Sequence, residues 1–117
     1  MLTYHYRDVG DIEGYASLLD RDVEFKLSDC PHRHGRVEVV KAQAALATPY
    51  ARHELFKVVA EGDTVVVLGR MVGSAGVQGQ SVPGGVDFAD IFTLSDDSLV
   101  LGCRRYHYLS PPKQPGV

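Results

Sequence analysis

The 117-residue sequence contains no tryptophan, only two cysteines and no long hydrophobic run. Cys30 and Cys103 are too few for a disulfide framework, so we expect reduced thiols and a cytoplasmic protein. No stretch approaches the roughly 18 consecutive apolar residues that a membrane-spanning helix needs, so no membrane contact is expected. The first eight residues also lack the basic start and the apolar stretch of a signal peptide.

The sequence also has little excess of charge of either sign. The net charge is −3, acids and bases are interspersed, and no basic run is present, which argues against nucleic-acid binding. An apolar share of 44% and a charged share of 23% are ordinary for a globular protein. The length fits one domain over residues 1–117, and the proline-rich residues 110–117 are expected to form a flexible tail.

Short helices and one strand are predicted in the first half of the chain. Asp11 is a suitable N-cap for a helix, and Gly10 ends the preceding one. The alternation of Val23, Phe25 and Leu27 with charged residues is typical of a half-buried strand. The sequence therefore predicts helices over 2–9, 12–19 and 37–47, a strand over 22–28 and a loop over 30–35.

Four long strands are predicted in the second half, over 52–60, 64–72, 86–94 and 99–109. The continuous aliphatic run 65–68 predicts that the second of them is covered on both faces. The glycine-rich residues 73–85 are expected to form a mobile lip over a pocket mouth. Helices followed by a meander of long strands predict an α+β fold. We expect a curved mixed sheet of four to six strands that forms a cone, closed by the short N-terminal helices around an apolar pocket.

Three segments resemble a known superfamily. Residues 10–23 (GDIEGYASLLDRDV) are similar to its helix-to-strand entry, 34–40 (HGRVEVV) to the start of its third helix, and 87–94 (DFADIFTL) to its paired final strands. In order and spacing the chain resembles the nuclear transport factor two-like superfamily, in particular its SnoaL-like polyketide cyclase and ketosteroid isomerase branch, over about residues 4–109. The resemblance implies the cone fold, a pocket and a homodimer, whereas members of this superfamily carry out different reactions.

Asp90 is the first candidate catalytic residue. In a strand of period two it shares one face with Phe88 and Phe92. A carboxylate between two phenylalanines that faces a closed interior would be desolvated, which raises its pKa and suits acid/base chemistry. The resemblance places Asp90 where ketosteroid isomerases hold a protonated aspartate. The alternative is a structural ion pair with a neighbouring arginine.

Arg104 and Tyr106 are the next candidates, because the alternation of the last strand places both on one face with Gly102. Pairing through the turn at 95–98 is expected to bring Arg104 close to the Asp90 strand. An inward arginine would keep Asp90 ionised, as a base, whereas without one Asp90 would be neutral and act as an acid. The alternative is that Arg104 and Arg105 place one charge in solvent and one in a structural ion pair.

The remaining candidates are expected to contact the ligand. His53 is either a base in the pocket or a structural histidine at its rim. Cys30, His32 and His34 do not have the spacing of a standard metal site, so no metal is expected. No other cofactor is expected either. The resemblance places the branch's first-strand base near Leu27 or Ser28, where no carboxylate stands, and Asp29 could replace it only with a register shift. The expected substrate-binding residues are Tyr4, Tyr15, Phe25, His53, Phe56, Phe88 and Phe92.

Together these features predict a small cofactor-free enzyme that performs acid/base chemistry on an apolar, oxygenated small molecule such as a polyketide-like metabolite. The reaction class is cyclisation, isomerisation or dehydration, with Asp90 as the proton shuttle. The alternatives are a non-catalytic ligand-binding protein with the same pocket and an interaction module. The apolar residues Ile91, Leu99 and Leu101 are expected on the outer sheet face, where a second copy of the chain would cover them.

Overall fold

The computed structural model describes residues 2–27, 31–46, 52–72 and 85–108. The expected glycine-rich lip and the expected tail lie outside these ranges, except for Gly85. Every predicted helix and strand is present, and a two-residue strand appears where a loop was expected. The elements in chain order are α1 (Leu2–Val9), α2 (Ile12–Ser17), β1 (Leu19–Lys26), β2 (Arg33–His34), α3 (Arg36–Leu46), β3 (Arg52–Glu61), β4 (Thr64–Val72), β5 (Val86–Leu94) and β6 (Val100–Tyr108).

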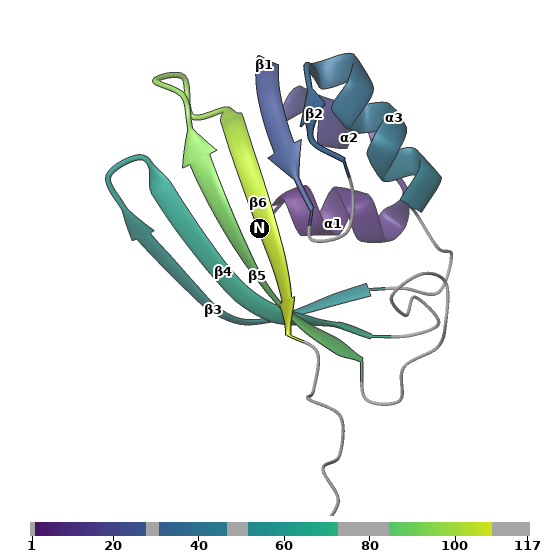
Figure 1. Cartoon of the computed structure of the whole chain (residues 1–117), viewed down its shortest axis with the longest axis vertical. Coiled ribbons are helices and arrows are strands. Elements are labelled where there is room, and N and C mark those ends of the chain that lie inside the picture. Colours follow the sequence, from purple (N-terminus) through teal and green to yellow (C-terminus); the bar gives the residue numbers. More distant parts are fainter. Residues whose placement is uncertain (1, 28–30, 47–51, 73–84, 109–117) are drawn as a thin grey trace, which may run out of the picture.

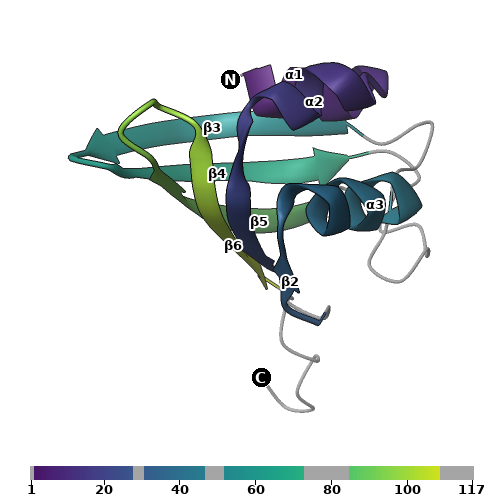
Figure 2. The ribbon, with the colours of Figure 1, turned by 90° about the horizontal axis from the view of Figure 1, so that it is seen from above.

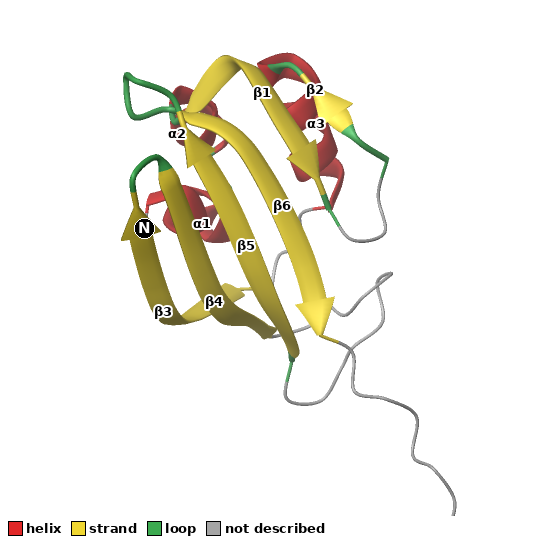
Figure 3. Ribbon diagram, turned by 60° about the vertical axis from the view of Figure 1, so that its left-hand side comes forward, coloured by secondary structure: helices red, strands yellow, loops and turns green. Residues whose placement is uncertain are grey.

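The strands form one six-stranded mixed sheet in the order β2-β1-β6-β5-β4-β3. β1 pairs with β6 in parallel, and all other neighbours are antiparallel. The sheet is strongly curved and does not close on itself, and the three helices lie on the inner side of the curve (Figures 1, 2 and 3). This arrangement confirms the expected α+β fold with a curved mixed sheet.

Local sequence explains where the first elements begin and end. The Asp11 side chain accepts a hydrogen bond from the backbone N–H of Gly14 at 2.8 Å, as expected of an N-cap. Helix α2 ends at Ser17, two residues earlier than predicted, because Leu19 already belongs to β1 and is buried in the core. At the turn between β3 and β4, Gly62 has a φ of +58°, a conformation that glycine adopts without steric cost.

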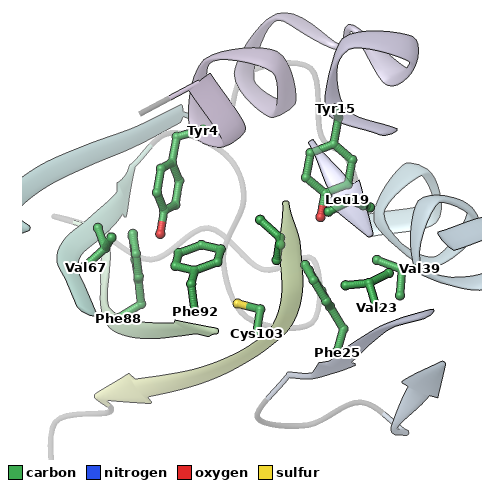
Figure 4. Packing of buried hydrophobic residues seen from close by; sticks show 11 residues of the cluster. Tyr4, Tyr15, Leu19, Val23, Phe25, Val39, Val67, Phe88, Phe92 and Cys103 are labelled. Carbon is green, nitrogen blue, oxygen red and sulfur yellow. The ribbon is translucent and has the colours of Figure 1, made fainter. Parts of the chain in front are cut away.

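The core lies between the helices and the inner face of the sheet (Figure 4). Tyr4 projects from α1 toward the sheet residues Phe88 and Phe92, and Tyr15 projects from α2 toward Leu19 and Phe25. The thiol of Cys103 is buried, which raises its pKa, so this cysteine is an unreactive core residue. The cluster is formed by Tyr4, Tyr15, Leu19, Val23, Phe25, Val39, Val67, Phe88, Phe92, Val100 and Cys103.

The outer face of the sheet is not covered by any described element. Val67 is fully buried on the inner face, whereas Leu68 is 41% exposed on the outer face. The expectation that the aliphatic run in β4 is covered on both faces is therefore wrong for the single chain, because all three helices lie on one side. Ile91 and Leu101 are exposed on the outer face, as expected, and Leu99 is half-buried.

Candidate active site

The inner face of α1 is polar where the helix meets the sheet. Tyr4, Arg7 and Asp8 stand at positions i, i+3 and i+4, a spacing that places them on one helical face. Tyr4 is buried, and Arg7 and Asp8 are half-buried. A helix that directs a phenol, a guanidinium and a carboxylate inward is unusual for a purely structural element, because buried polar groups destabilise a fold unless they are hydrogen-bonded.

Two of these three side chains have partners on the sheet. The first is Tyr4, whose hydroxyl donates a hydrogen bond to Asp90 Oδ2 at 2.6 Å. Asp90 is 0% exposed, and Arg105 binds both its oxygens, Nε to Oδ1 and Nη2 to Oδ2, at 2.7 Å each. The Arg105 guanidinium also lies over the ring of Phe88, 4.3 Å from its centroid. The result is a buried network that joins α1, β5 and β6.

Arg105 determines the charge of Asp90. Burial alone would raise the pKa of Asp90, but the hydrogen bonds and the charge of Arg105 outweigh burial and lower it. Burial and the adjacent Asp90 charge raise the pKa of Tyr4 far above its ordinary value, so the phenol keeps its proton. Asp90 is therefore an ionised acceptor rather than a neutral acid.

The second pair joins Asp8 to His53 on β3. His53 Nδ1 lies 2.6 Å from Asp8 Oδ1, and the backbone N–H of His53 donates to Asp8 Oδ2 at 2.9 Å. The imidazole packs against the rings of Tyr4 and Phe88 at centroid distances of 5.0 and 5.5 Å. Burial and the charges of Arg7 and Arg105 lower the pKa of His53 to about 4, against the opposing effect of Asp8.

Several residues expected at the site face the interior. Phe88, Asp90 and Phe92 are all buried on the inner face, so the period-two prediction for β5 is confirmed. Tyr4 and Tyr15 are buried as well, and Tyr4 makes the direct contact with Asp90. Phe25 is buried beside α3, where it lines a separate pocket.

Arg104 and Tyr106 do not face the interior, contrary to expectation. Thr93 pairs with Gly102 but Leu94 pairs with Val100, so β6 contains one additional residue, a β-bulge. Beyond the bulge the alternation is inverted: Arg105 points inward, Arg104 is exposed and Tyr106 is 52% exposed. Neither of the two expected residues can touch a molecule bound beside Asp90, and Arg105 takes the place expected for Arg104.

Phe56 also lies on the outer face, where it is 59% exposed. Since His53 and Leu55 face inward, the alternation of β3 turns Phe56 outward, where the Arg70 guanidinium lies 5.6 Å from its ring centroid. The expectation that Phe56 contacts an interior ligand is therefore wrong.

A pocket of about 130 Å³ lies between α3, β1 and the neighbouring residues of β2. Its lining is largely apolar, and Gln43 is nearly buried there with Nε2 lacking a hydrogen-bond partner among the described residues. The lining residues are Phe25, Leu27, Pro31, Arg33, Val39, Ala42, Gln43 and Ala45.

Sequence reasoning missed Asp8 and Arg7, and it considered Arg105 only in the alternative of a structural ion pair, which is the arrangement found. The signal for the first two was the i, i+3, i+4 spacing with Tyr4 in α1, which marks one helical face. In the described ranges no three potential metal ligands gather, and Cys30 lies outside them. No described helix is both long and apolar enough to cross a membrane.

The family model of the SnoaL-like domain matches residues 4–101, most of the chain. The chain belongs to the SnoaL-like domain family. No curated protein matches it. Solved structures do match it. Their TM-scores of 0.75 to 0.77 show a shared fold, and at sequence identities of 15 to 22% the likeness extends to the fold alone.

Three of these structures illustrate the likeness. A candidate SnoaL-like polyketide cyclase from Jannaschia sp. CCS1 is 22% identical, with a TM-score of 0.77 over 94% of this chain and 88% of its own. A candidate ketosteroid isomerase from Kribbella flavida is 15% identical, with a TM-score of 0.77 over 98% and 78%. A candidate polyketide cyclase from Sinorhizobium meliloti is 15% identical, with a TM-score of 0.75 over 90% of each chain.

Proposed function

We propose that this SnoaL-like protein is a small cofactor-free acid/base enzyme of the cyclase, isomerase or dehydratase type that acts on an apolar, oxygenated small molecule. The observation that supports the proposal is the hydrogen bonding of the two ring nitrogens of His53. Its Nδ1 is bound to Asp8, while its Nε2 is buried and has no hydrogen-bond partner among the described residues. Nothing among the described residues bonds to that nitrogen, which leaves its lone pair for a substrate.

The pairing of His53 with Asp8 determines which nitrogen can act as a base. An ionised carboxylate only accepts hydrogen bonds, so Nδ1 carries the proton and Nε2 keeps its lone pair. With a pKa of about 4, the imidazole is neutral at pH 7 and Nε2 is free to take a proton. Asp8 then stabilises the imidazolium that forms, as the carboxylate does in hydrolase triads.

The chemistry that follows needs no external reactant. His53 Nε2 removes a proton from a carbon beside a carbonyl group, and the electron pair moves onto the carbonyl oxygen. Return of the proton from the imidazolium to another carbon completes an isomerisation. Its transfer to a departing hydroxyl releases water in a dehydration. If the carbanion instead attacks a second carbonyl of the same molecule, the imidazolium protonates the resulting alkoxide and a ring is closed.

The Asp90 network lies beside this base, because the Tyr4 ring packs against the His53 ring at a centroid distance of 5.0 Å. Asp90 accepts three hydrogen bonds and has a lowered pKa, which suits the orientation of Tyr4 better than the exchange of protons. The Tyr4 oxygen retains a lone pair that can accept a hydrogen bond from a substrate hydroxyl. Direct proton transfer by Asp90 stays a prediction. The variant Asp90→Asn tests it in the same assay as the His53 variants.

Deuterium incorporation tests the proposal without knowledge of the natural substrate. The protein is incubated in D2O with acetophenone, indanone and tetralone, and loss of the proton beside each carbonyl is followed by proton NMR. We expect exchange above the buffer rate for at least one ketone. His53→Gln should lower that rate about a hundredfold or more, because general-base catalysis contributes that much. Asp8→Asn should also lower it.

His5→Gln is the matched control, because His5 lies on the exposed side of the same helix. It should leave the exchange rate unchanged. Exchange at the buffer rate with all three ketones, or full exchange by His53→Gln, would show that His53 is not the base.

A second candidate is a ligand-binding protein without catalysis. The observation in its favour is the complete pairing of Asp90, whose two oxygens are held by Arg105 and Tyr4 as in a structural ion pair. Ketone binding in the NMR experiment with no exchange would support this candidate over the enzyme.

A further inference from the structure

Arg7 lies on the polar inner face of α1, and its side chain has no partner among the described residues. Tyr4 is bound to Asp90 and Asp8 is bound to His53. The described part of the structure gives the Arg7 guanidinium neither an ion pair nor a hydrogen bond. It is nevertheless half-buried, and burial lowers its pKa. A guanidinium withdrawn from water without a counter-charge destabilises the fold, which suggests that it serves another purpose.

A second unsatisfied polar group faces the same interior. Tyr15 is only 3% exposed, and its hydroxyl is buried with no hydrogen-bond partner among the described residues. Figure 4 shows this hydroxyl pointing from α2 into the space between helices and sheet. Burial raises the pKa of Tyr15, and the nearby charge of Arg7 opposes that rise, so the two side chains act on each other electrostatically. The phenol keeps its proton and is a hydrogen-bond donor.

We propose that Arg7 and Tyr15 bind a carboxylate group of the ligand. The proposal rests on the proposed function in that it names the substrate class as apolar carboxylic acids. The guanidinium offers N–H groups that match the two oxygens of a carboxylate, and the phenol adds a further donor. Both carboxylates of the site are already engaged, Asp90 by Arg105 and Asp8 by His53, so neither neutralises Arg7.

The position of the two donors agrees with the chemistry proposed for His53. Arg7 follows Tyr4 by three residues and precedes Asp8, so it lies on the face of α1 that also positions the base. The charge of Arg7 lowers the pKa of His53, which places the two groups within electrostatic reach of each other. An anionic group held by Arg7 would therefore anchor a substrate beside the unprotonated imidazole nitrogen.

Binding of matched pairs of small molecules tests the proposal. Benzoate, phenylacetate and cinnamate are each compared with the corresponding amide by isothermal titration calorimetry at pH 7. We expect at least one carboxylate to bind the unmodified protein about 10- to 100-fold more tightly than its amide, since hydrogen bonds to charged groups contribute that much. If no carboxylate binds more tightly than its amide, the proposal is wrong.

Variants assign the preference to residues. Arg7→Met keeps the aliphatic stem and removes the charge, and it should abolish the preference for the carboxylate. Tyr15→Phe should reduce it by a smaller factor. Arg104→Met is the matched control, because it removes the same charge from the exposed outer face of β6 and should leave the preference intact. A carboxylate preference that persists in Arg7→Met would refute the assignment.

A further measurement separates a ligand site from a merely structural arginine. Without ligand, Arg7→Met should be at least as stable toward urea as the unmodified protein, because it removes an unpaired charge from a half-buried position. A structural arginine would show the reverse, with lower stability and unchanged binding. Because no turnover is measured, carboxylate binding and ketone exchange succeed or fail independently. Failure of exchange therefore refutes the enzyme alone, and failure of binding refutes the carboxylate site alone.

Discussion

Replacement of Arg105 by methionine should destabilise the fold more than almost any other single change. Asp90 is 0% exposed, and two of the three hydrogen bonds to its carboxylate come from Arg105. The variant would keep a buried charge with Tyr4 as its remaining donor. Breaking a buried ion pair in this way costs about 3–5 kcal/mol. Because a domain of this kind has about 5–15 kcal/mol of stability in total, the loss would be measurable in urea.

The intact network of Tyr4, Asp90 and Arg105 is expected to contribute much less to the free energy of unfolding than the loss in Arg105→Met suggests. In the triple variant Tyr4→Phe, Asp90→Leu, Arg105→Met no charge or hydroxyl is left unpaired. Its free energy of unfolding should return to within about 1–2 kcal/mol of the unmodified protein, because apolar replacement of buried ion pairs is often neutral. Arg104→Met, on the exposed outer face of the same strand, is the control and should change stability by about 0.5 kcal/mol or less.

The pH dependence tests whether the loss is electrostatic. With Arg105 present the pKa of Asp90 is lowered, so its contribution is present at neutral pH and is lost only as acid protonates it. Without Arg105, burial raises that pKa, and the penalty exists only while Asp90 is charged. The gap in unfolding free energy between Arg105→Met and the unmodified protein, measured at equal pH, should therefore narrow from pH 7 to pH 5. A gap that does not change with pH would refute this reasoning.

Three further predictions concern other parts of the molecule. Gly69→Ala should cost about 1–3 kcal/mol in urea unfolding, because its Cβ would lie 2.5 Å from the Glu54 carbonyl oxygen, whereas Gly102→Ala, with 3.6 Å to its nearest atom, should cost much less. Because the pKa of His53 is lowered to about 4, the unfolded chain takes up this proton first. The stability that His53 contributes should therefore fall by about 2 kcal/mol from pH 7 to pH 5, and His53→Gln should abolish that part of the fall. We also propose that two copies pair through the outer sheet face. Ile91→Glu should then yield monomers in light scattering and Val37→Glu on α3 should not, while a monomeric unmodified protein would refute the proposal.

Local sequence rules were sufficient to predict the helices and strands and to predict which side chains of β5 face inward. The N-cap at Asp11, the turn at Gly62 and the alternation of Phe88, Asp90 and Phe92 depend on near neighbours in the chain, and the sequence displays them directly. These features placed the central carboxylate on the correct face of the sheet.

Features that depend on tertiary pairing could not be predicted in the same way. The bulge in β6 follows from how this strand pairs with β5, and it exchanged the expected positions of Arg104 and Arg105. The contact of Asp8 with His53 joins residues 45 positions apart, and no local pattern marks it. The spacing of the polar residues in α1 can be read from the sequence, but the groups that they contact depend on the sheet against which the helix packs.

The single additional residue in β6 has a consequence for how such a protein can change. At a bulge the strand holds one residue more than its partner, while the pairs on either side, Leu94 with Val100 and Thr93 with Gly102, each lie on a common face of the sheet. Removing Leu101 would therefore restore regular pairing and leave Arg105 opposite Asp90 on the inner face. The strand can thus lose one residue at this point while the chemical groups that face a bound molecule stay the same.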